Sequence, residues 1–400
     1  MPESVEQLAA TLRHADEQRR AVVPTGLGAF LHLGALPRKY DVALSLQHLN
    51  RVVDYQPTDM TVTVEAGMPL TQLQQVLGEH GQWLPIDPPL PERATIGGIL
   101  AANLSGPSRL MHGTIRDALL GLKAVRADGT VMKGGGKVVK NVAGYDIPKL
   151  FCGSFGTLGV IVEATFKVLP RSEAQAVLAF ACLTPDAAMN VVLGVTGSEL
   201  QPAFLEVANF APLASFNSPQ PYRLFVGFAG IAEEVQYQCR RLRTLVGAPG
   251  VVELESGEEQ AQALVPTLRD FPVAGSALLR CKASLLPTKV ALFCREAEAE
   301  AQSRGLATQL LAHAGNGIVY SRFTTLDELP QEKLISFIDW LRILSKKLEG
   351  YLVVEDLAPA LKERVDVWGH VGGAFPLMKR LKDTLDPNGT LNPGRFVGGI

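Results

Sequence analysis

Apolar residues recur at helical spacing near the N-terminus and then change to the spacing of strands. Val5, Leu8, Ala9 and Leu12 share one face of an otherwise polar segment, and this period predicts an amphipathic helix. Beyond it, alternation every two residues predicts strands, because successive side chains of a strand point to opposite faces. The strands predicted in the first 170 residues are 21–24, 41–46, 51–55, 61–65 and 160–168.

Proline and glycine interrupt this region. A helical stripe over 70–77 is followed by a proline-rich corner at 85–91, which cannot be regular structure. Glycine is then dense from 94 to 158. Because glycine costs conformational entropy on folding, this density suggests backbone that lies against something large and flat.

The pattern changes after residue 171, where amphipathic strands and helices alternate and glycine clusters become rare. Strands are predicted at 176–183, 222–229, 277–283 and 317–322, and helices at 233–246 and 335–348. This mixture predicts an α+β domain in which an antiparallel sheet carries helices on one side. The expected domain spans are 1–172, 173–380 and a C-terminal tail at 381–400.

Composition and charge narrow the class of protein. A chain of 400 residues favours two domains, and 38 basic against 40 acidic residues provide no strongly basic face for nucleic acid. No apolar run reaches the roughly 20 residues that span a bilayer, and the polar N-terminus does not resemble a signal peptide. Five cysteines without CxxC spacing argue against disulfides, zinc and an iron–sulfur cluster in this chain. A cytoplasmic location is therefore expected.

A glycine-rich loop follows the first predicted strand. Thr25, Gly26, Leu27 and Gly28 occupy it, and glycines with positive φ let successive N–H groups point into one concavity that binds phosphate. The spacing is not GxGxxG and no helix begins at Gly28, so a Rossmann fold is disfavoured. A plain turn remains the alternative.

Two further segments combine glycine with polar side chains. The first, 94–106, contains Thr95, Asn103 and Ser105, and fits either a closely packed glycine helix or backbone laid against a nucleotide. The second runs from 137 to 161 and has glycines just before the strand 160–168. A surface turn would account for its glycines but not for its neighbouring polar residues.

Together and in this order, the segments resemble the FAD-binding domain of the vanillyl-alcohol-oxidase, or PCMH, family. The letters PIDPP, ATIGG, NLSGPSR, HGTIRD and KNVAGYDIPKLFCGSFGTLGVI are more narrowly similar to the FAD-binding subunits of bacterial glycolate oxidases. The resemblance implies a two-subdomain FAD-binding domain over about 20–170, followed by an α+β cap domain. It also implies a C-terminal tail that returns to the flavin.

The resemblance assigns cofactor contacts to particular residues. The pyrophosphate loop would be Pro24, Thr25, Gly26, Leu27, Gly28, Ala29 and Phe30. The ribityl chain and isoalloxazine would be lined by Pro88, Thr95, Gly97, Gly98, Asn103, Ser105 and Gly106. The remaining contacts would come from Gly156, Gly159, Val160, Ile161, Asn392 and Arg395. Since Ala29 and Phe30 lie in the first loop and His32 lies beyond it, non-covalent FAD is expected.

The resemblance further implies a complex that oxidises glycolate to glyoxylate. A larger paralogous flavoprotein and an iron–sulfur subunit would complete the electron path, and the partners could hold the chain at the inner face of the membrane. A self-sufficient FAD dehydrogenase of 2-hydroxy acids and a structural subunit with a vestigial flavin site remain alternatives.

Catalytic relatives carry an H-x-G-D-G-N-x-H segment and an E-H-G segment that bind a divalent metal. Here Asn316 and Tyr320 replace the aspartate and the last histidine, and Glu355 is not followed by histidine. We therefore predict no metal and a hydrogen-bonded core histidine at His313. Other candidates, each weighed against an ordinary structural role, are Arg116 and Arg280 as carboxylate clamps, His112 and Tyr145 beside the flavin, and Lys140 and Arg395 as donors to the flavin N1 and C2 oxygen.

Overall fold

The computed structural model describes residues 1–137, 146–247, 250–254, 258–325 and 329–400, in two compact units. The first unit comprises Met1–Ser105, Gly113–Arg171 and His370–Ile400, and the second comprises Gly106–His112 and Ser172–Gly369. Residues 106–112 thus group with the second unit and 370–380 with the first, whereas the predicted spans divide the chain at 172/173. The predicted spans stay a prediction of domain organisation.

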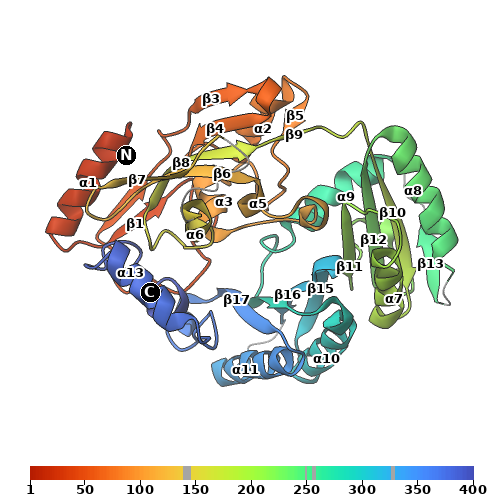
Figure 1. Cartoon of the computed structure of the whole chain (residues 1–400). Coiled ribbons are helices and arrows are strands. Elements are labelled where there is room, and N and C mark those ends of the chain that lie inside the picture. Colours follow the sequence, from red (N-terminus) through yellow and green to blue (C-terminus); the bar gives the residue numbers. More distant parts are fainter. Residues whose placement is uncertain (138–145, 248–249, 255–257, 326–328) are drawn as a thin grey trace. The chain divides into compact units, whose positions relative to one another are not determined.

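Three sheets form the strand framework of the first unit, as far as its residues are described (Figure 1). The largest is antiparallel in the order β3-β4-β8-β6-β7, with bounds β3 Val52–Gln56, β4 Thr61–Glu65, β6 Leu119–Val125, β7 Val131–Gly135 and β8 Val160–Lys167. A parallel pair joins β1 Val22–Thr25 to β2 Val42–Ser45, and an antiparallel pair joins β5 Gln82–Trp83 to β9 Leu169–Pro170. The predicted strand 61–65 matches β4 in both bounds.

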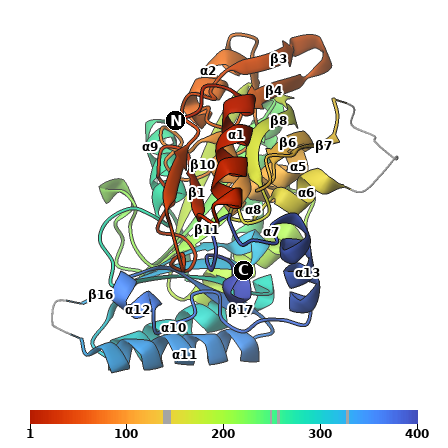
Figure 2. The ribbon, with the colours of Figure 1, turned by 90° about the vertical axis from the view of Figure 1, so that its left-hand side faces the viewer.

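The helices of the first unit are α1 Val5–Glu17, α2 Leu70–Gly78, α3 Ile96–Ala102, α5 Ile115–Ala118, α6 Ile147–Phe151 and α13 Phe375–Leu385. α1 begins at the N-cap Ser4, whose hydroxyl accepts a hydrogen bond from the Gln7 N–H, and it buries the predicted face of Leu8, Ala9 and Leu12. Figure 2 shows α1 beside β1, as does Figure 1.

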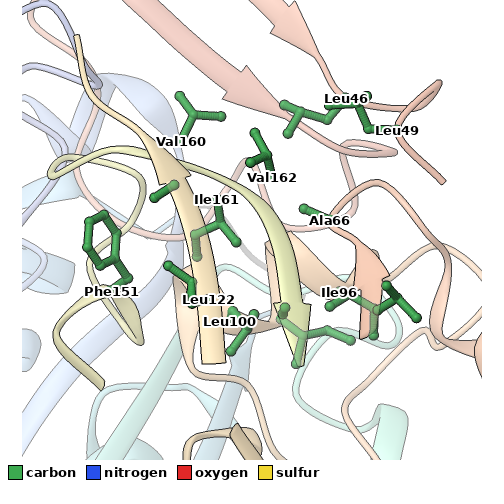
Figure 3. Packing of buried hydrophobic residues seen from close by; sticks show 14 of the residues in the cluster. Leu46, Leu49, Ala66, Ile96, Leu100, Leu122, Phe151, Val160, Ile161 and Val162 are labelled. Carbon is green, nitrogen blue, oxygen red and sulfur yellow. The ribbon is translucent and has the colours of Figure 1, made fainter. Parts of the chain in front are cut away.

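The core of the first unit forms where α3 packs against β8. Ile96 and Leu100 of α3 are fully buried and lie with Val162 of β8 in one cluster (Figure 3). A Cβ at Gly97 would lie only 2.9 Å from the Cβ of Ala66. Glycine therefore allows the close approach of this helix, which agrees with the first of the two interpretations of the 94–106 segment, a closely packed glycine helix.

The C-terminal tail of the chain returns to the first strand. Leu391 forms a parallel bridge with Val22 of β1. The Val22 N–H donates to the Thr390 carbonyl at 2.7 Å, and the Asn392 N–H donates to the Val22 carbonyl at 3.0 Å. Residues after 390 are thereby held next to the strand that leads into the glycine-rich loop.

The second unit is built on an eight-stranded antiparallel sheet in the order β13-β10-β12-β11-β15-β16-β14-β17. Its strands are β10 Ala174–Cys182, β11 Phe204–Ala208, β12 Tyr222–Gly230, β13 Val251–Leu254, β14 Leu279–Ser284, β15 Ala307–His313, β16 Ile318–Thr324 and β17 Tyr351–Leu357. The antiparallel α+β prediction for this part of the chain is confirmed.

Four helices follow one another across this sheet in the order α8, α7, α10, α11 (Figure 1). Their bounds are α7 Pro185–Thr196, α8 Ala232–Leu245, α10 Val290–Ser303 and α11 Gln331–Lys347, and the remaining helices are α4 Arg109–His112, α9 Glu258–Asp270 and α12 Pro359–Lys362. α4 contacts β11, and α9 contacts β10. None of the helices in the described parts of the chain is both long and apolar enough to cross a membrane.

Candidate functional site

A groove in the first unit runs along the loop after β1, the start of α3 and the C-terminal tail. One part is lined by Pro24, Thr25, Gly26, Leu27, Gly28, Ala29, Phe30, Leu31, Arg93, Thr95, Gly98, Ala101, Ala102, Phe155, Asn392 and Arg395. The adjoining part shares many of these residues and adds Leu46, Ala66, Gly97, Gly156, Gly159, Val160 and Ile161. Segments more than 350 residues apart in the sequence thus form one continuous surface.

The floor of the groove depends on a close contact between the glycine loop and α3. Thr95 is the N-cap of α3, and its Oγ1 accepts a hydrogen bond from the Gly98 N–H at 3.3 Å. A Cβ at Gly26 would lie 2.2 Å from that same Oγ1, which is a severe overlap. Gly28 has φ +75°, a conformation that favours glycine. Both glycines are therefore required by the geometry of the loop.

The opposite side of the groove joins the 153–159 segment to the tail. Asn392 Nδ2 donates to the Phe155 carbonyl at 2.7 Å, and this bond fixes the orientation of the amide. The Oδ1 of Asn392 is buried, and no partner for it lies among the described residues. A buried acceptor without a partner is costly, so this oxygen suits a donor on a bound ligand.

Arg395 organises the loop that follows the glycines. Its Nη2 donates to the carbonyls of Leu31 at 2.8 Å and Leu33 at 3.0 Å. The Ala35 N–H donates in turn to the Arg395 carbonyl at 3.1 Å. Burial lowers the pKa of the guanidinium from its usual range. Contact of Arg395 with the flavin N1 stays a prediction, whereas its role in holding the loop is visible.

The groove gathers most of the sequence-predicted contacts but leaves out four. Pro88 and Ser105 are buried elsewhere in the first unit, and Gly106 belongs to the second unit. Asn103 ends α3 in a left-handed conformation with φ 49°, and its buried Oδ1 has no partner among the described residues. These four residues remain predicted contacts that the groove does not include.

Several lining residues were missed by the sequence analysis. Ala101 and Ala102 follow Gly98 by three and four positions, so helical periodicity could have placed them on the same face. Phe155 lies within the predicted 137–161 segment and Arg93 directly precedes the 94–106 segment, but neither residue was assigned a contact. The Arg93 side chain is exposed and makes no hydrogen bond or ion pair within the described parts of the chain, so it offers an unbalanced cation beside the groove.

The residues present fit FAD. A loop with glycine at two positions allows backbone N–H groups to face a diphosphate, and the small residues of α3 leave room for a flat ring system. The unpartnered Asn392 oxygen and the Arg93 cation add an acceptor and a positive charge. When bound, FAD would supply the redox chemistry, and these groups would supply binding and orientation.

The other candidates have different surroundings. Lys140 and Tyr145 lie outside the described residues. Arg116 is exposed, and His112 belongs to the second unit, where burial lowers its pKa. The Arg280 guanidinium is buried and donates to the carbonyls of Ala274 at 2.8 Å and Gly275 at 2.5 Å, so it anchors a loop.

His313 is a buried, hydrogen-bonded core histidine, as predicted. Its Nδ1 lies 2.7 and 2.8 Å from the two carboxylate oxygens of Glu206 on β11, and both side chains are almost completely buried. No partner for Nε2 is present among the described residues. The His313–Glu206 pair ties β15 to its neighbour β11 inside the sheet.

The surroundings of Tyr320 do not fit a divalent metal. Burial raises the pKa of its phenol, which keeps it protonated, and the Lys282 ammonium lies 5.7 Å from the centre of its ring. Burial also raises the pKa of the Glu355 carboxyl, and the positive charges of Lys282 and Arg280 partly offset this rise. In the described part of the chain, no three His, Cys, Asp or Glu side chains gather closely enough to hold a metal ion.

Fold and groove together define a flavin-nucleotide-binding protein of the PCMH type with an α+β cap unit. Family models agree over most of the chain: the FAD binding domain matches residues 1–135, and the C-terminal domain of FAD linked oxidases matches residues 171–396. The chain therefore belongs to the family of FAD-linked oxidases, and it is a FAD-dependent oxidoreductase.

Curated relatives extend over nearly the whole chain. The glycolate oxidase subunit GlcD of Bacillus subtilis is 28% identical over 420 residues, covering 99% of this chain and 87% of the relative. The D-lactate dehydrogenase of Archaeoglobus fulgidus is 29% identical, covering 99% and 90%. The glycolate oxidase subunit GlcE of Escherichia coli is 44% identical, but over 125 residues that cover 31% of this chain and 36% of GlcE.

Solved structures confirm the fold. An alkyldihydroxyacetonephosphate synthase structure superposes with a TM-score of 0.74 at 19% identity, covering 99% of this chain and 76% of the other. The 4-ethylphenol oxidase from Gulosibacter chungangensis gives 0.73 at 16% identity, covering 98% and 88%. At these identities the comparison concerns the fold alone.

Proposed function

We propose that this chain is the FAD-binding subunit of a glycolate oxidase, or glycolate dehydrogenase, complex. In that role it takes part in oxidising glycolate to glyoxylate and passes electrons to partner subunits. The main support for this proposal is a contrast between the two units. The first unit contains a groove that fits FAD, whereas the surroundings of Tyr320 in the second unit do not fit a metal. The local 44% identity to GlcE supports the same role.

The groove suits non-covalent FAD. Ala29 and Phe30 line the loop beside the expected diphosphate, and neither can form a bond to the flavin. Cys152 lies outside the two parts of this groove, and burial raises the pKa of its thiol to about 11, so little of the reactive thiolate exists at neutral pH.

Partner subunits would complete the electron path. We propose a paralogous FAD-containing subunit that oxidises the substrate and an iron–sulfur subunit that receives electrons. A cytoplasmic location, with association to the inner face of the membrane through these partners, belongs to the same proposal. Co-purification of a tagged chain from its native host, followed by identification of the bound proteins and of their iron, tests it. Recovery of the tagged chain without any bound partner protein would contradict the proposed complex.

A self-sufficient FAD dehydrogenase of a 2-hydroxy acid is the second candidate. The observation that favours it is the match over 99% of this chain to relatives named D-lactate dehydrogenase and D-2-hydroxyglutarate dehydrogenase. A structural subunit with a vestigial flavin site is the third candidate, and loss of FAD binding would favour it.

The visible spectrum of the purified chain tests the cofactor and then separates the first two candidates. We expect a flavin band near ~450 nm that titrates to one FAD per chain. Anaerobic glycolate or D-lactate should leave the band unchanged in the isolated chain and bleach it when the partner subunits are added. Bleaching of the isolated chain by substrate would favour the self-sufficient dehydrogenase. Absence of FAD uptake would contradict both.

A further inference from the structure

Helix α13 has a lysine as its most deeply buried side chain, because its apolar residues Phe375, Met378, Leu381 and Leu385 are only partly buried. Of its eleven residues, Lys382 is the buried one, and its side chain is 8% exposed. Helix α1 of the same unit shows the ordinary alternative, since it buries Leu8, Ala9, Leu12 and Ala15. A buried ammonium is costly unless all its protons find acceptors.

Three acceptors surround the Lys382 ammonium. Its Nζ donates to the Thr157 carbonyl at 2.8 Å, to the Leu391 carbonyl at 2.9 Å and to Asp386 Oδ2 at 2.5 Å. These contacts use all three protons of the ammonium group. They also come from three separate places: the 153–159 segment, the turn after α13, and the tail.

Asp386 completes the network from the other side. Its Oδ1 accepts from the Thr390 N–H at 2.9 Å, and its Oδ2 accepts from the Leu391 N–H at 2.8 Å. The Asp386 side chain is completely buried. The turn between α13 and the tail is thus fixed by charge-assisted hydrogen bonds, which are short and directional.

Both segments held by Lys382 border the groove. Thr157 lies between Phe155 and Gly159, which line it, and Leu391 precedes Asn392, whose amide lines both of its parts. The Asn392 amide itself joins these segments by its bond to the Phe155 carbonyl. A displacement of the tail relative to the 153–159 segment would therefore move the unpartnered Asn392 oxygen.

We propose that the buried Lys382–Asp386 ion pair is a positioning pair for FAD. It fixes the tail against the 153–159 segment so that Asn392 meets the cofactor in one orientation. An apolar contact could also bury this face of α13. It would not fix the position of the tail along the 153–159 segment, because apolar packing has no preferred direction. The proposal depends on FAD binding by the family and not on the glycolate oxidase complex.

The chain offers a matched control on the same helix. Lys379 pairs with Asp383 at 2.9 Å across one helical turn, as Lys382 pairs with Asp386, but both residues of the outer pair are 59% exposed. Replacing each lysine by methionine keeps the unbranched stem and the helix propensity, and it removes the charge. The two variants differ in whether the lost ammonium joins the tail to the 153–159 segment.

The test titrates FAD into each full-length apoprotein and records the visible circular dichroism of the FAD-saturated form. For Lys382→Met we expect about a tenfold or greater rise in the dissociation constant and an altered flavin dichroism at saturation. For Lys379→Met we expect both to remain as in the wild type. Lys382→Arg, which keeps the charge and the donors, should recover part of the affinity.

Two results would overturn the proposal. One is a Lys382→Met protein with wild-type affinity and dichroism. The other is a weaker affinity accompanied by wild-type dichroism at saturation, because a loss of global stability alone would leave the bound flavin unchanged. If Lys382→Met does not fold, the same comparison is made between Asp386→Asn and Asp383→Asn, with the same expected contrast.

Discussion

At the scale of single residues, the groove combines backbone that needs glycine with a few isolated polar groups. The Asn392 oxygen is an acceptor that no described residue satisfies, and the Arg93 guanidinium is a cation without a partner in the described chain. An isolated exposed charge contributes little to folding, because water solvates it well. Its place in the groove wall makes it suited to balance the diphosphate of FAD.

Substituting Arg93 tests this charge. Arg93→Gln should weaken FAD and ADP by about threefold to fivefold, since exposed ion pairs contribute less than ~1 kcal/mol, and it should reduce the salt dependence of binding. Adenosine, which lacks the diphosphate, should bind equally to both proteins. Calorimetric titration with ADP and adenosine measures the difference. Arg93→Lys should restore most of it, whereas Arg380→Gln on α13 serves as the control. Equal losses for ADP and adenosine would contradict the assignment.

At the scale of elements, the crossing of the glycine loop over the start of α3 shapes the groove. Thr95 stabilises the helix as its N-cap and also contacts the loop at Gly26. The same side chain therefore joins the two elements, so a change on either one is transmitted to the other.

Gly26→Ala should disturb this crossing. Its Cβ would overlap Thr95, so the loop must move; we expect a loss of about 1–3 kcal/mol in stability and at least a tenfold weaker FAD affinity. Gly136→Ala is the matched control, because a Cβ there meets no atom of the described residues within 4 Å. Adding Thr95→Ala to Gly26→Ala should recover affinity relative to the single variant. Denaturant unfolding measures the stability, and flavin fluorescence measures the FAD affinity. If the effects of Gly26→Ala and Thr95→Ala on affinity simply add in the double variant, the proposed contact between the two residues is contradicted.

At the scale of the whole molecule, the chain has two compact units with separate cores. One hydrophobic cluster joins α1, α3 and the five-stranded sheet, and another lies between α9 and the eight-stranded sheet. Both parts of the FAD-type groove are lined by first-unit residues alone. A ligand that binds only the folded form of one unit stabilises that unit by mass action.

Calorimetry should therefore resolve two unfolding transitions. FAD at a hundred times its dissociation constant should stabilise the first unit by about 2.7 kcal/mol, which raises its midpoint by roughly 5–10 °C. The other midpoint should stay unchanged. Limited proteolysis during the heating series would assign each transition to its unit. A single transition that moves as a whole with FAD would show that the units unfold together.

The sequence determined those elements whose signal is local. β4 has the predicted bounds, and α8 and β12 agree with their predictions within one residue at each end, because alternation and helical spacing follow from short-range backbone geometry. The strand Phe204–Ala208 was not predicted, because its sequence FLEVA does not alternate apolar with polar residues. The glycine loop was predicted from residues adjacent in the chain.

Only the tertiary structure decided which distant residues meet at the groove. The sequence did not single out Arg93 or Phe155 as lining residues, and their place in the groove follows from how the chain folds. The contact between Lys382 and Thr157 joins residues 225 positions apart, and a lysine on a helix ordinarily predicts a solvated surface. Local propensity acts over a few residues, whereas burial, acceptors and unpaired atoms are properties of neighbours in space.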